Sequence, residues 1–200
     1  MLTLFHAPRS RSTRFLWLLE ELGLPHNVRY VSIRYADGSG DGPDPANPHP
    51  DRKVPALRHG DALVTESAAV ATYLADLAPE AGLAPAIGAA DRGAYLTWLS
   101  WIEGECGPAI ASRFGVAPGD PEPAAFTAAL RRIETALSRG PFLLGERFSA
   151  ADVMLGGTLD WARQVLPADG TIAAYGARLA ARPACVRAMA RDAVPQAVAA

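Results

Sequence analysis

Two regions with different apolar periodicities can be recognised along the chain. In the first region, Leu2 to Phe5 predicts a short strand, residues 13–23 carry apolar side chains at helical spacing, and residues 28–33 alternate as in a second strand. Gly23 and Pro25 mark the end of the helix. Because a helix connects the two strands, we expect them to be parallel with a right-handed connection.

A hairpin is predicted over residues 55–65, and a helix follows it directly. Two apolar segments flank a tight turn at residues 59–61, and a helical pattern begins at Ser67 and stops before Pro79. Proline has no backbone N–H to donate, so Pro55 suits the first position of a strand. Residues 1–78 therefore predict a mixed four-stranded sheet with helices packed on it, an α/β layer.

From residue 91 onward the strand signals disappear. Helical spacing marks one helix by Leu96, Leu99 and Ile102 and another by Phe126, Leu130, Ile133 and Leu137. The intervening Pro, Gly and Ala residues have the composition of a linker. We therefore predict an N-terminal α/β domain at 1–78, a linker at 79–90 and an all-helical C-terminal domain at 91–200.

Two shorter segments add local detail. Residues 36–51 are rich in Gly, Pro and Asp, which disfavours regular helix and predicts a long loop that is either functional or mobile. The segment FSAADV at 148–153 has Ser149 as a helix N-cap and Asp152 three residues later, the arrangement of a capping box. We interpret this second motif as purely structural.

Composition and charge narrow the class of protein. Half of the 200 residues are apolar, 20% are charged and the formal net charge is −2, which gives no electrostatic basis for binding nucleic acid or an anionic membrane. No apolar run approaches the length of a membrane span and no leader is evident, so a cytoplasmic location is expected. The two cysteines, Cys106 and Cys185, have no metal-ligand spacing, so neither a metal site nor a disulfide framework is predicted.

The first helix carries charges opposite to those its dipole favours. Arginines crowd its N-terminal end and glutamates its C-terminal end, namely Arg9, Arg11 and Arg14 against Glu20 and Glu21. The cationic loop also offers the hydroxyls of Ser10 and Ser12 beside a helix N-terminus, an environment that favours an anion such as a thiolate. The alternative is that one serine, most readily Ser12, is an N-cap and the arginines are solvated.

The edge of the hairpin indicates a peptide-like ligand. A cis peptide at Val54-Pro55 would leave the backbone N–H and C=O of Val54 facing outward, free to pair with an extended peptide. Glu66 could bind an ammonium group, while the helix N-terminus with the Ser67 hydroxyl could bind a carboxylate. Taken alone, Glu66 and Ser67 would be a dipole partner and an N-cap.

Four motifs in order resemble the cytosolic glutathione transferases. They are SRSTRFLWLLEELGLP from Ser10, KVPAL from Lys53, TES ending at Ser67, and FLLGERFSAADV ending at Val153. The first is similar to a signature of a serine-type bacterial and fungal branch of that family. The resemblance spans nearly the whole chain and implies a thioredoxin-like N-terminal domain, an all-helical C-terminal domain, glutathione as co-substrate and a homodimer.

The resemblance also implies roles for individual residues. It places the catalytic serine at Ser10, with Ser12 as the second choice, and the γ-glutamyl contacts at Glu66 and Ser67. The cis-proline motif falls on Val54-Pro55, and Lys53 is a candidate contact for the glycyl carboxylate. Loop 36–51 replaces a helix that the family often has, which leaves contacts from Asn47 or His49 open.

The expected activity is attack of the glutathione thiolate on a small hydrophobic electrophile. Apolar and aromatic side chains that could contact the electrophile between the domains are Trp98, Trp101, Ile102 and Phe114. The interpretation favoured for most of them is that they belong to the core. Three alternatives remain open on the sequence: a glutathione-dependent peroxidase, dehalogenase or isomerase; backbone amides in place of a serine; or a non-catalytic binding protein with the same fold.

Overall fold

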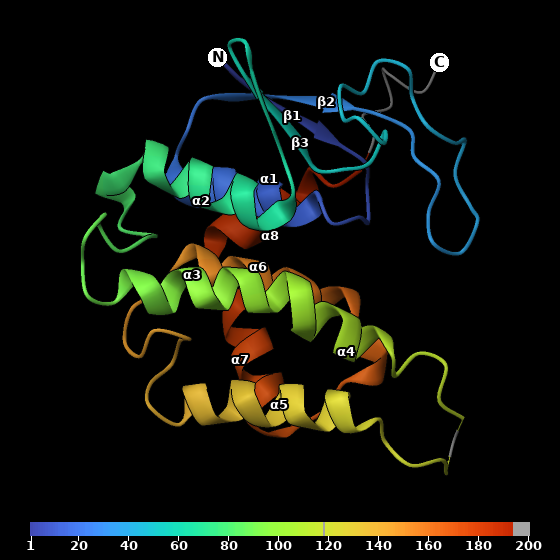
Figure 1. The fold of residues 1–200 in the computed structure, drawn as a ribbon, viewed down its shortest axis with the longest axis vertical. Helices are drawn as coiled ribbons and strands as arrows, with labels where there is room; N and C mark the ends of the chain where they lie inside the picture. Colours follow the sequence, from blue (N-terminus) through green and yellow to red (C-terminus); the bar gives the residue numbers. More distant parts are fainter. Residues whose placement is uncertain (118, 194–200) are drawn as a thin grey trace. The chain divides into compact units, whose positions relative to one another are not determined.

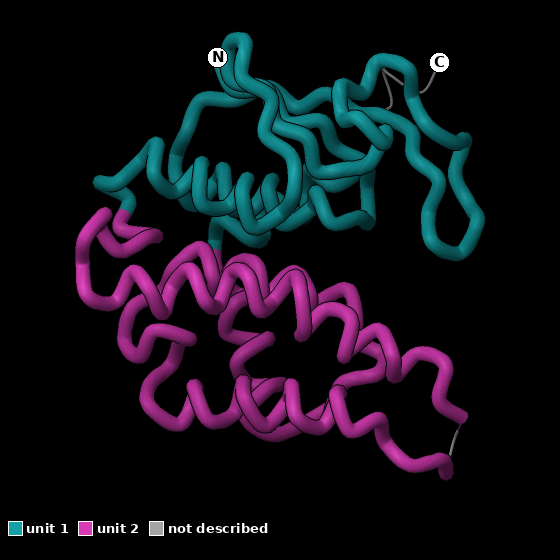
Figure 2. The backbone as a smooth tube through the Cα atoms, in the orientation of Figure 1, with its two compact units in different colours: residues 1–81, 183–200 teal, residues 82–182 magenta. Residues whose placement is uncertain are grey.

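A computed structural model describes residues 1–117 and 119–193, which form two compact units (Figure 1, Figure 2). Unit 1 comprises residues 1–81 together with the chain from Pro183 onward, and unit 2 comprises residues 82–182. In the described part of the chain, no helix combines the length and the apolar character that crossing a bilayer requires.

Unit 1 is an α/β layer with the order predicted from the sequence. Its elements are β1 (Leu2–His6), α1 (Thr13–Leu22), β2 (His26–Tyr30), β3 (Ala56–His59), β4 (Ala62–Thr65), α2 (Ser67–Leu77), the 3₁₀ turn η1 (Pro79–Ala81) and, from the end of the chain, α8 (Pro183–Ala190). The four-stranded sheet has the order β2-β1-β3-β4. The β1–β2 pair is parallel and the other two pairs are antiparallel, which confirms the mixed sheet.

Helices α1 and α2 cover one face of this sheet (Figure 1). The core between them is formed by fully enclosed apolar side chains from both layers, among them Leu4, Phe15, Leu18, Leu57 and Leu74. Helix α1 ends at Gly23, whose φ of +64° is the left-handed conformation that a helix C-cap favours and a residue with Cβ resists. The second strand ends at Tyr30, before the predicted 33, because its register with β1 stops at the His6–Tyr30 pair.

Helix α8 belongs to unit 1, although the sequence places it in a C-terminal domain at 91–200. It packs against α1 and buries Ala184, Cys185 and Ala188. Arg187 Nε donates to Glu20 Oε2 at 2.9 Å, and this hydrogen bond is the main reason why the pKa of Glu20 is lowered. The acidic C-terminal end of α1 thus has a partner that periodicity alone does not reveal.

Unit 2 is helical. It contains α3 (Arg92–Trp101), the π-helical segment η2 (Ile102–Cys106), α4 (Gly107–Ala111), α5 (Ala124–Leu137), α6 (Ala150–Trp161), the 3₁₀ turn η3 (Arg163–Val165) and α7 (Gly170–Ala180). The predicted capping box is present at the start of α6, where the Ser149 N–H donates to Asp152 Oδ2 at 2.9 Å. Asp152 is fully buried and also accepts from the Leu143 N–H and the Tyr175 hydroxyl.

Candidate functional site

The pairing of the strands brings four loops of unit 1 to one end of the sheet. Phe5 lies opposite Ala56, and Ala56 lies opposite Thr65, so the chain leaves β1, enters β3 and leaves β4 at the same end. The end of β2 is there too, because His6 pairs with Tyr30. The loop after β1, the Val54-Pro55 segment and the start of α2 are therefore neighbours, as the candidate site requires.

The loop after β1 holds Ser10 and Ser12 in a shared hydrogen-bond network. Their Oγ atoms lie 2.7 Å apart, and Ser10 Oγ is also 2.6 Å from the Ala7 carbonyl oxygen, to which it donates. Ser12 Oγ accepts from the Ala7 N–H at 3.1 Å and lies 2.8 Å from His6 Nδ1. Ser12 is completely buried, whereas Ser10 is half-buried.

Ser12 occupies the N-cap position of α1 but its side chain makes no capping hydrogen bond. Its hydroxyl is used inside the loop instead, on Ala7 and His6. Ser12 therefore has the N-cap position and a structural role, as the alternative interpretation expected. Its hydroxyl, however, contacts Ala7 and His6 and not the first amides of the helix.

His6 is a buried histidine that stays neutral at neutral pH. Burial lowers its pKa from 6.5 to about 4, and the nearby Arg191 acts in the same direction while Asp192 opposes it. Its Nε2 lies 3.4 Å from Asp192 Oδ1 and makes no hydrogen bond within the described residues. Neither His6 nor Asp192 was predicted as a site residue, because neither belongs to a motif that periodicity or spacing reveals.

The Val54-Pro55 peptide bond is cis, as expected. Pairing of β3 with β1 begins at Ala56, and within the described residues the backbone N–H and C=O of Val54 make no hydrogen bond. Lys53 is 71% exposed, and its ammonium lies 3.4 Å from Asp51 Oδ2. This segment offers a free backbone edge with a flexible cation beside it.

Loop 36–51 contains no helix or strand but is tied to the site by its buried polar residues. The Asn47 side chain is fully buried and donates to the Lys53 carbonyl oxygen at 2.9 Å, and its own carbonyl accepts from the His49 N–H. Just before this loop, the Tyr35 hydroxyl donates to the Pro8 carbonyl oxygen at 2.7 Å, which connects the start of the loop to the loop after β1. Asn47 therefore fixes the backbone of Lys53 by a hydrogen bond from the buried side of the loop.

Glu66 and Ser67 lie at the N-terminus of α2. Glu66 is exposed and makes no side-chain cap on the helix, so the first amides of α2 are not occupied by its carboxylate. Ser67 is the first helical residue and is 4% exposed. The arrangement gives a carboxylate for a cation and, immediately beside it, uncapped helix amides for an anion.

Backbone strain is concentrated at this end of the sheet. Among the described residues, the non-glycine residues with positive φ are Arg9 at +53°, Arg52 at +56° and Glu66 at +66°. One precedes Ser10, one precedes Lys53 and one precedes Ser67. Such conformations cost about 1–3 kcal/mol each and cluster at functional sites, so their coincidence with the three candidate segments points to a binding site there.

The four candidate electrophile contacts lie in unit 2 and are not equivalent. Trp101 and Ile102 are buried in its core. Phe114 is 39% exposed and packs on Trp161, which is 52% exposed, with ring centroids 4.9 Å apart. Trp161 was not among the predicted residues; the signal that could have found it is a large aromatic residue at the end of an otherwise apolar helix.

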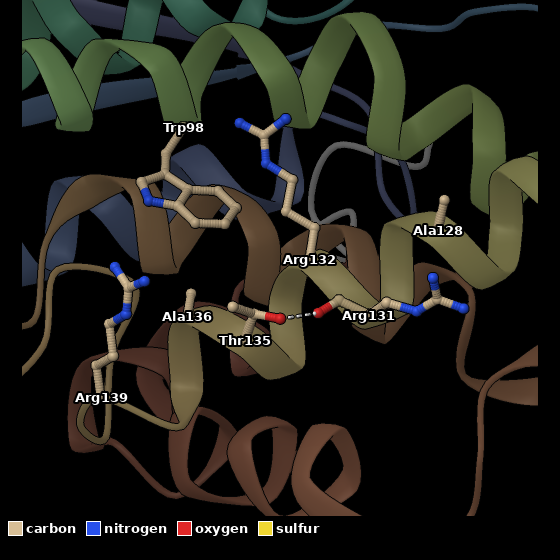
Figure 3. A pocket seen from close by; sticks show the side chains of 7 residues that line it. All are labelled: Trp98, Ala128, Arg131, Arg132, Thr135, Ala136 and Arg139. Atoms are coloured by element: carbon tan, nitrogen blue, oxygen red, sulfur yellow. Dashed lines mark hydrogen bonds between the residues drawn. The ribbon is translucent and has the colours of Figure 1, made fainter.

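Trp98 faces a different environment. It lines a pocket of about 390 Å³ between α3 and α5 with Ala128, Arg131, Arg132, Thr135, Ala136 and Arg139. The Arg132 guanidinium lies 5.2 Å from the centroid of the Trp98 ring and 4.4 Å from that of Trp101. Figure 3 shows that Arg131 and Arg139 extend toward opposite ends of the pocket, so its cationic groups do not converge on one point.

Two segments of the chain, one in each half of the sequence, match models of the same protein family. Residues 9–77 match the family model "Glutathione S-transferase, N-terminal domain" and residues 121–191 match "Glutathione S-transferase, C-terminal domain". Glutathione S-transferase GstA of Escherichia coli O157:H7 is 33% identical over 145 residues, covering 68% of this chain and 71% of that protein.

Two further similarities are informative. Disulfide-bond oxidoreductase YfcG of Escherichia coli K12 is 27% identical over 169 residues and 76% of each chain. A sphingomonad glutathione S-transferase solved in complex with glutathione has a TM-score of 0.78 and 29% identity, covering 96% of this chain and 100% of that one.

Proposed function

The chain belongs to the glutathione S-transferase family, and from this premise we propose that it binds glutathione at the loop end of the unit 1 sheet. The observation that carries the proposal is the strand register Phe5–Ala56–Thr65, which gathers Ser10, the Val54 backbone and the start of α2 at one place. The sphingomonad relative, solved with glutathione, supports the identity of the ligand.

Each end of the tripeptide has a matching group in this site. The exposed Glu66 carboxylate would bind the γ-glutamyl ammonium, and the uncapped amides at Ser67 would bind the adjacent carboxylate. The unpaired backbone of Val54 would pair with the backbone of the cysteinyl residue in the manner of an added strand. Lys53 would bind the glycyl carboxylate with its exposed ammonium.

Ser10, and not Ser12, is the proposed donor to the glutathione sulfur, which makes the chain a member of the serine-type branch. Ser12 Oγ is fully enclosed by Ala7, His6 and Ser10, so it cannot reach a ligand without breaking that network. Ser10 is half-buried, and rotation of its hydroxyl away from the Ala7 carbonyl would direct it outward. In this assignment Ser12 supports Ser10 from inside.

The chemistry requires only a hydrogen-bond donor. A free thiol has a pKa near 8.5, and a hydrogen bond to a charged acceptor contributes about 1.5–3 kcal/mol, which lowers that pKa by about 1–2 units. The thiol proton passes to water, the sulfur then forms a bond to the electrophilic carbon, and the leaving group departs with its bonding electron pair. Arg9 and Arg11, both exposed in the same loop, would add a favourable electrostatic environment.

We propose the exposed Phe114 and Trp161 pair as the surface that contacts the electrophile. Trp101 and Ile102 are enclosed in the core of unit 2 and have no surface to offer, and Trp98 is covered on one face by Arg132. An exposed aromatic pair costs free energy in water and suits a flat apolar ligand. A homodimer, expected from the family resemblance, and a cytoplasmic location, expected from the sequence, stay part of this proposal.

A disulfide reductase activity is the second candidate, favoured by the similarity to the oxidoreductase YfcG. The loop after β1 contains no cysteine, and both Cys106 and Cys185 are buried. Any thiol–disulfide exchange would therefore use the thiolate of glutathione itself, formed by the same Ser10. A substrate panel containing an aryl halide and a mixed glutathione disulfide separates the two reactions.

The decisive experiment is an ultraviolet titration of the thiolate of bound glutathione. We expect the wild-type protein to lower the thiol pKa by about 1–2 units and Ser10→Ala to abolish most of that effect. Ser138→Ala, an exposed serine at the end of α5, is the matched control and should titrate like the wild type. An unchanged titration in Ser10→Ala would transfer the role to backbone amides.

A further inference from the structure

The residue that follows helix α8 by two positions reaches back to the loop after β1. Asp192 lies in unit 1, and its carboxylate contacts that loop and the neighbouring strand at three points. Its Oδ2 accepts from the Arg9 N–H at 2.9 Å, its Oδ1 accepts from the Thr13 hydroxyl at 2.5 Å, and Oδ1 also lies 3.4 Å from His6 Nε2.

The three groups that Asp192 contacts, on Arg9, Thr13 and His6, are all linked to Ser10. Arg9 immediately precedes it and is held in a left-handed conformation, with φ at +53°. Thr13 Oγ1 accepts from the Ser10 N–H at 3.3 Å. His6 contacts Ser12 Oγ at 2.8 Å, and Ser12 Oγ lies 2.7 Å from Ser10 Oγ. One carboxylate thus accepts hydrogen bonds from the backbone before Ser10 and from the hydroxyl that holds its N–H. It also lies beside the His6 ring, which contacts Ser12.

Asp192 is itself held in place. Arg191 Nη1 donates to Glu20 Oε1 at 2.7 Å, and the Tyr30 hydroxyl donates to the Arg191 carbonyl oxygen at 2.8 Å. Helix α8, two residues earlier, packs against α1. The carboxylate is therefore supported by the core of unit 1 and can transmit that rigidity to the loop.

We propose that Asp192 is a positioning residue that holds loop 7–12 in the conformation from which Ser10 acts on the glutathione thiol. The inference rests on the proposed role of Ser10. In this role Asp192 does not touch the ligand and acts through its hydrogen bonds with the Arg9 N–H and the Thr13 hydroxyl.

Loss of a positioning role and loss of a negative charge would shift the pKa of the bound thiol in opposite directions. A carboxylate near a thiolate repels it, so removal of the Asp192 charge alone would lower the pKa of the bound thiol. Loss of positioning would raise that pKa, because the Ser10 donor would no longer be held in place. The titratable groups that interact with the Asp192 carboxylate include His6, Tyr30 and Tyr35, and the charged Arg9 donates its backbone N–H to it. Arg191 acts on His6 and Tyr30. All of these residues remain in the variant proposed below.

The test is the thiolate titration of bound glutathione in Asp192→Asn. An amide retains the shape but has one acceptor oxygen, so it cannot accept from both the Arg9 N–H and the Thr13 hydroxyl as the carboxylate does. We therefore expect the bound thiol to have a pKa about 0.5–1 higher than in the wild type, with up to about tenfold less thiolate at fixed pH. Glutathione affinity should change by less than about threefold, because Glu66, Ser67 and Val54 are untouched. Asp192→Glu should restore part of the thiolate.

Asp61→Asn is the matched control, because Asp61 is an exposed acid in the hairpin turn of the same unit. It should leave the titration unchanged. Should Asp192→Asn not fold, Thr13→Val removes the same link from the other side and should raise the thiol pKa in the same direction.

The outcomes separate this inference from the proposed function. If Ser10→Ala raises the thiol pKa while a folded Asp192→Asn leaves it unchanged or lowers it, Asp192 has no positioning role and the proposed function stands. If wild-type protein does not lower the thiol pKa at all, both fall together.

Discussion

The buried neutral His6 predicts a specific loss of stability in acid. Its pKa is about 4 in the folded protein, against 6.5 for an unperturbed histidine, chiefly because burial disfavours the charged ring. The unfolded chain therefore binds this proton more tightly than the folded one does. The stabilisation is fully present above pH 6.5 and is lost as the pH falls from 6.5 to about 4.

The magnitude follows from the difference between the two values. It corresponds to about 3 kcal/mol when each pKa unit contributes 1.36 kcal/mol. Glu20, whose pKa is lowered by its hydrogen bonds with Arg187 and Arg191, also loses stabilisation as the pH falls. The His6 contribution must therefore be obtained as a difference between the wild type and a variant that lacks the ring.

His6→Asn is the appropriate variant, because an amide can replace the Nδ1 contact with Ser12 Oγ without titrating. Urea unfolding at a series of pH values between 7 and 4 should show that the wild type loses about 3 kcal/mol more than the variant. A proton NMR titration of the His6 ring in the wild type provides a second measurement and should show a neutral imidazole at pH 5. Parallel stability curves for the two proteins, or a ring that protonates near pH 6.5, would show that His6 is not held neutral by the fold.

Two further predictions concern buried groups of unit 2. Tyr175→Phe should lower the free energy of unfolding by about 1–3 kcal/mol, because it removes the hydroxyl that donates to the fully buried Asp152 carboxylate; urea unfolding measures this. Burial raises the pKa of the Cys106 thiol to about 12, so native protein should not react with a thiol-directed disulfide reagent at pH 8. Modification of Cys106 before unfolding would contradict that expectation.

Most elements of unit 1 could be predicted from the sequence, and so could the candidate residues on which the proposed glutathione site is built. Periodicity 2 and 3.6 place the strands and helices, and Gly23, Pro55 and Pro79 mark the boundaries because their backbone restrictions are local. The capping box of α6 was predictable for the same reason, since Ser149 and Asp152 are three residues apart. Local signals of this kind need no knowledge of what packs against them.

Which side chains are buried and which stay accessible depends on contacts between distant parts of the chain, and these contacts are visible only in the folded protein. Ser10 and Ser12 both remain candidates on the sequence, with Ser10 preferred, and burial of Ser12 against Ala7 and His6 distinguishes them in the structure. Trp101 and Phe114 are both aromatic residues of one helical region, yet one is enclosed and the other exposed, because neighbouring helices cover only part of that surface.

The placement of α8 and Asp192 beside the first loop is also a tertiary property. It joins residues separated by about 180 positions along the chain through side-chain hydrogen bonds. Hydrophobic periodicity describes one element at a time and carries no information on which element lies beside it, so such long-range pairings emerge only when the core is assembled.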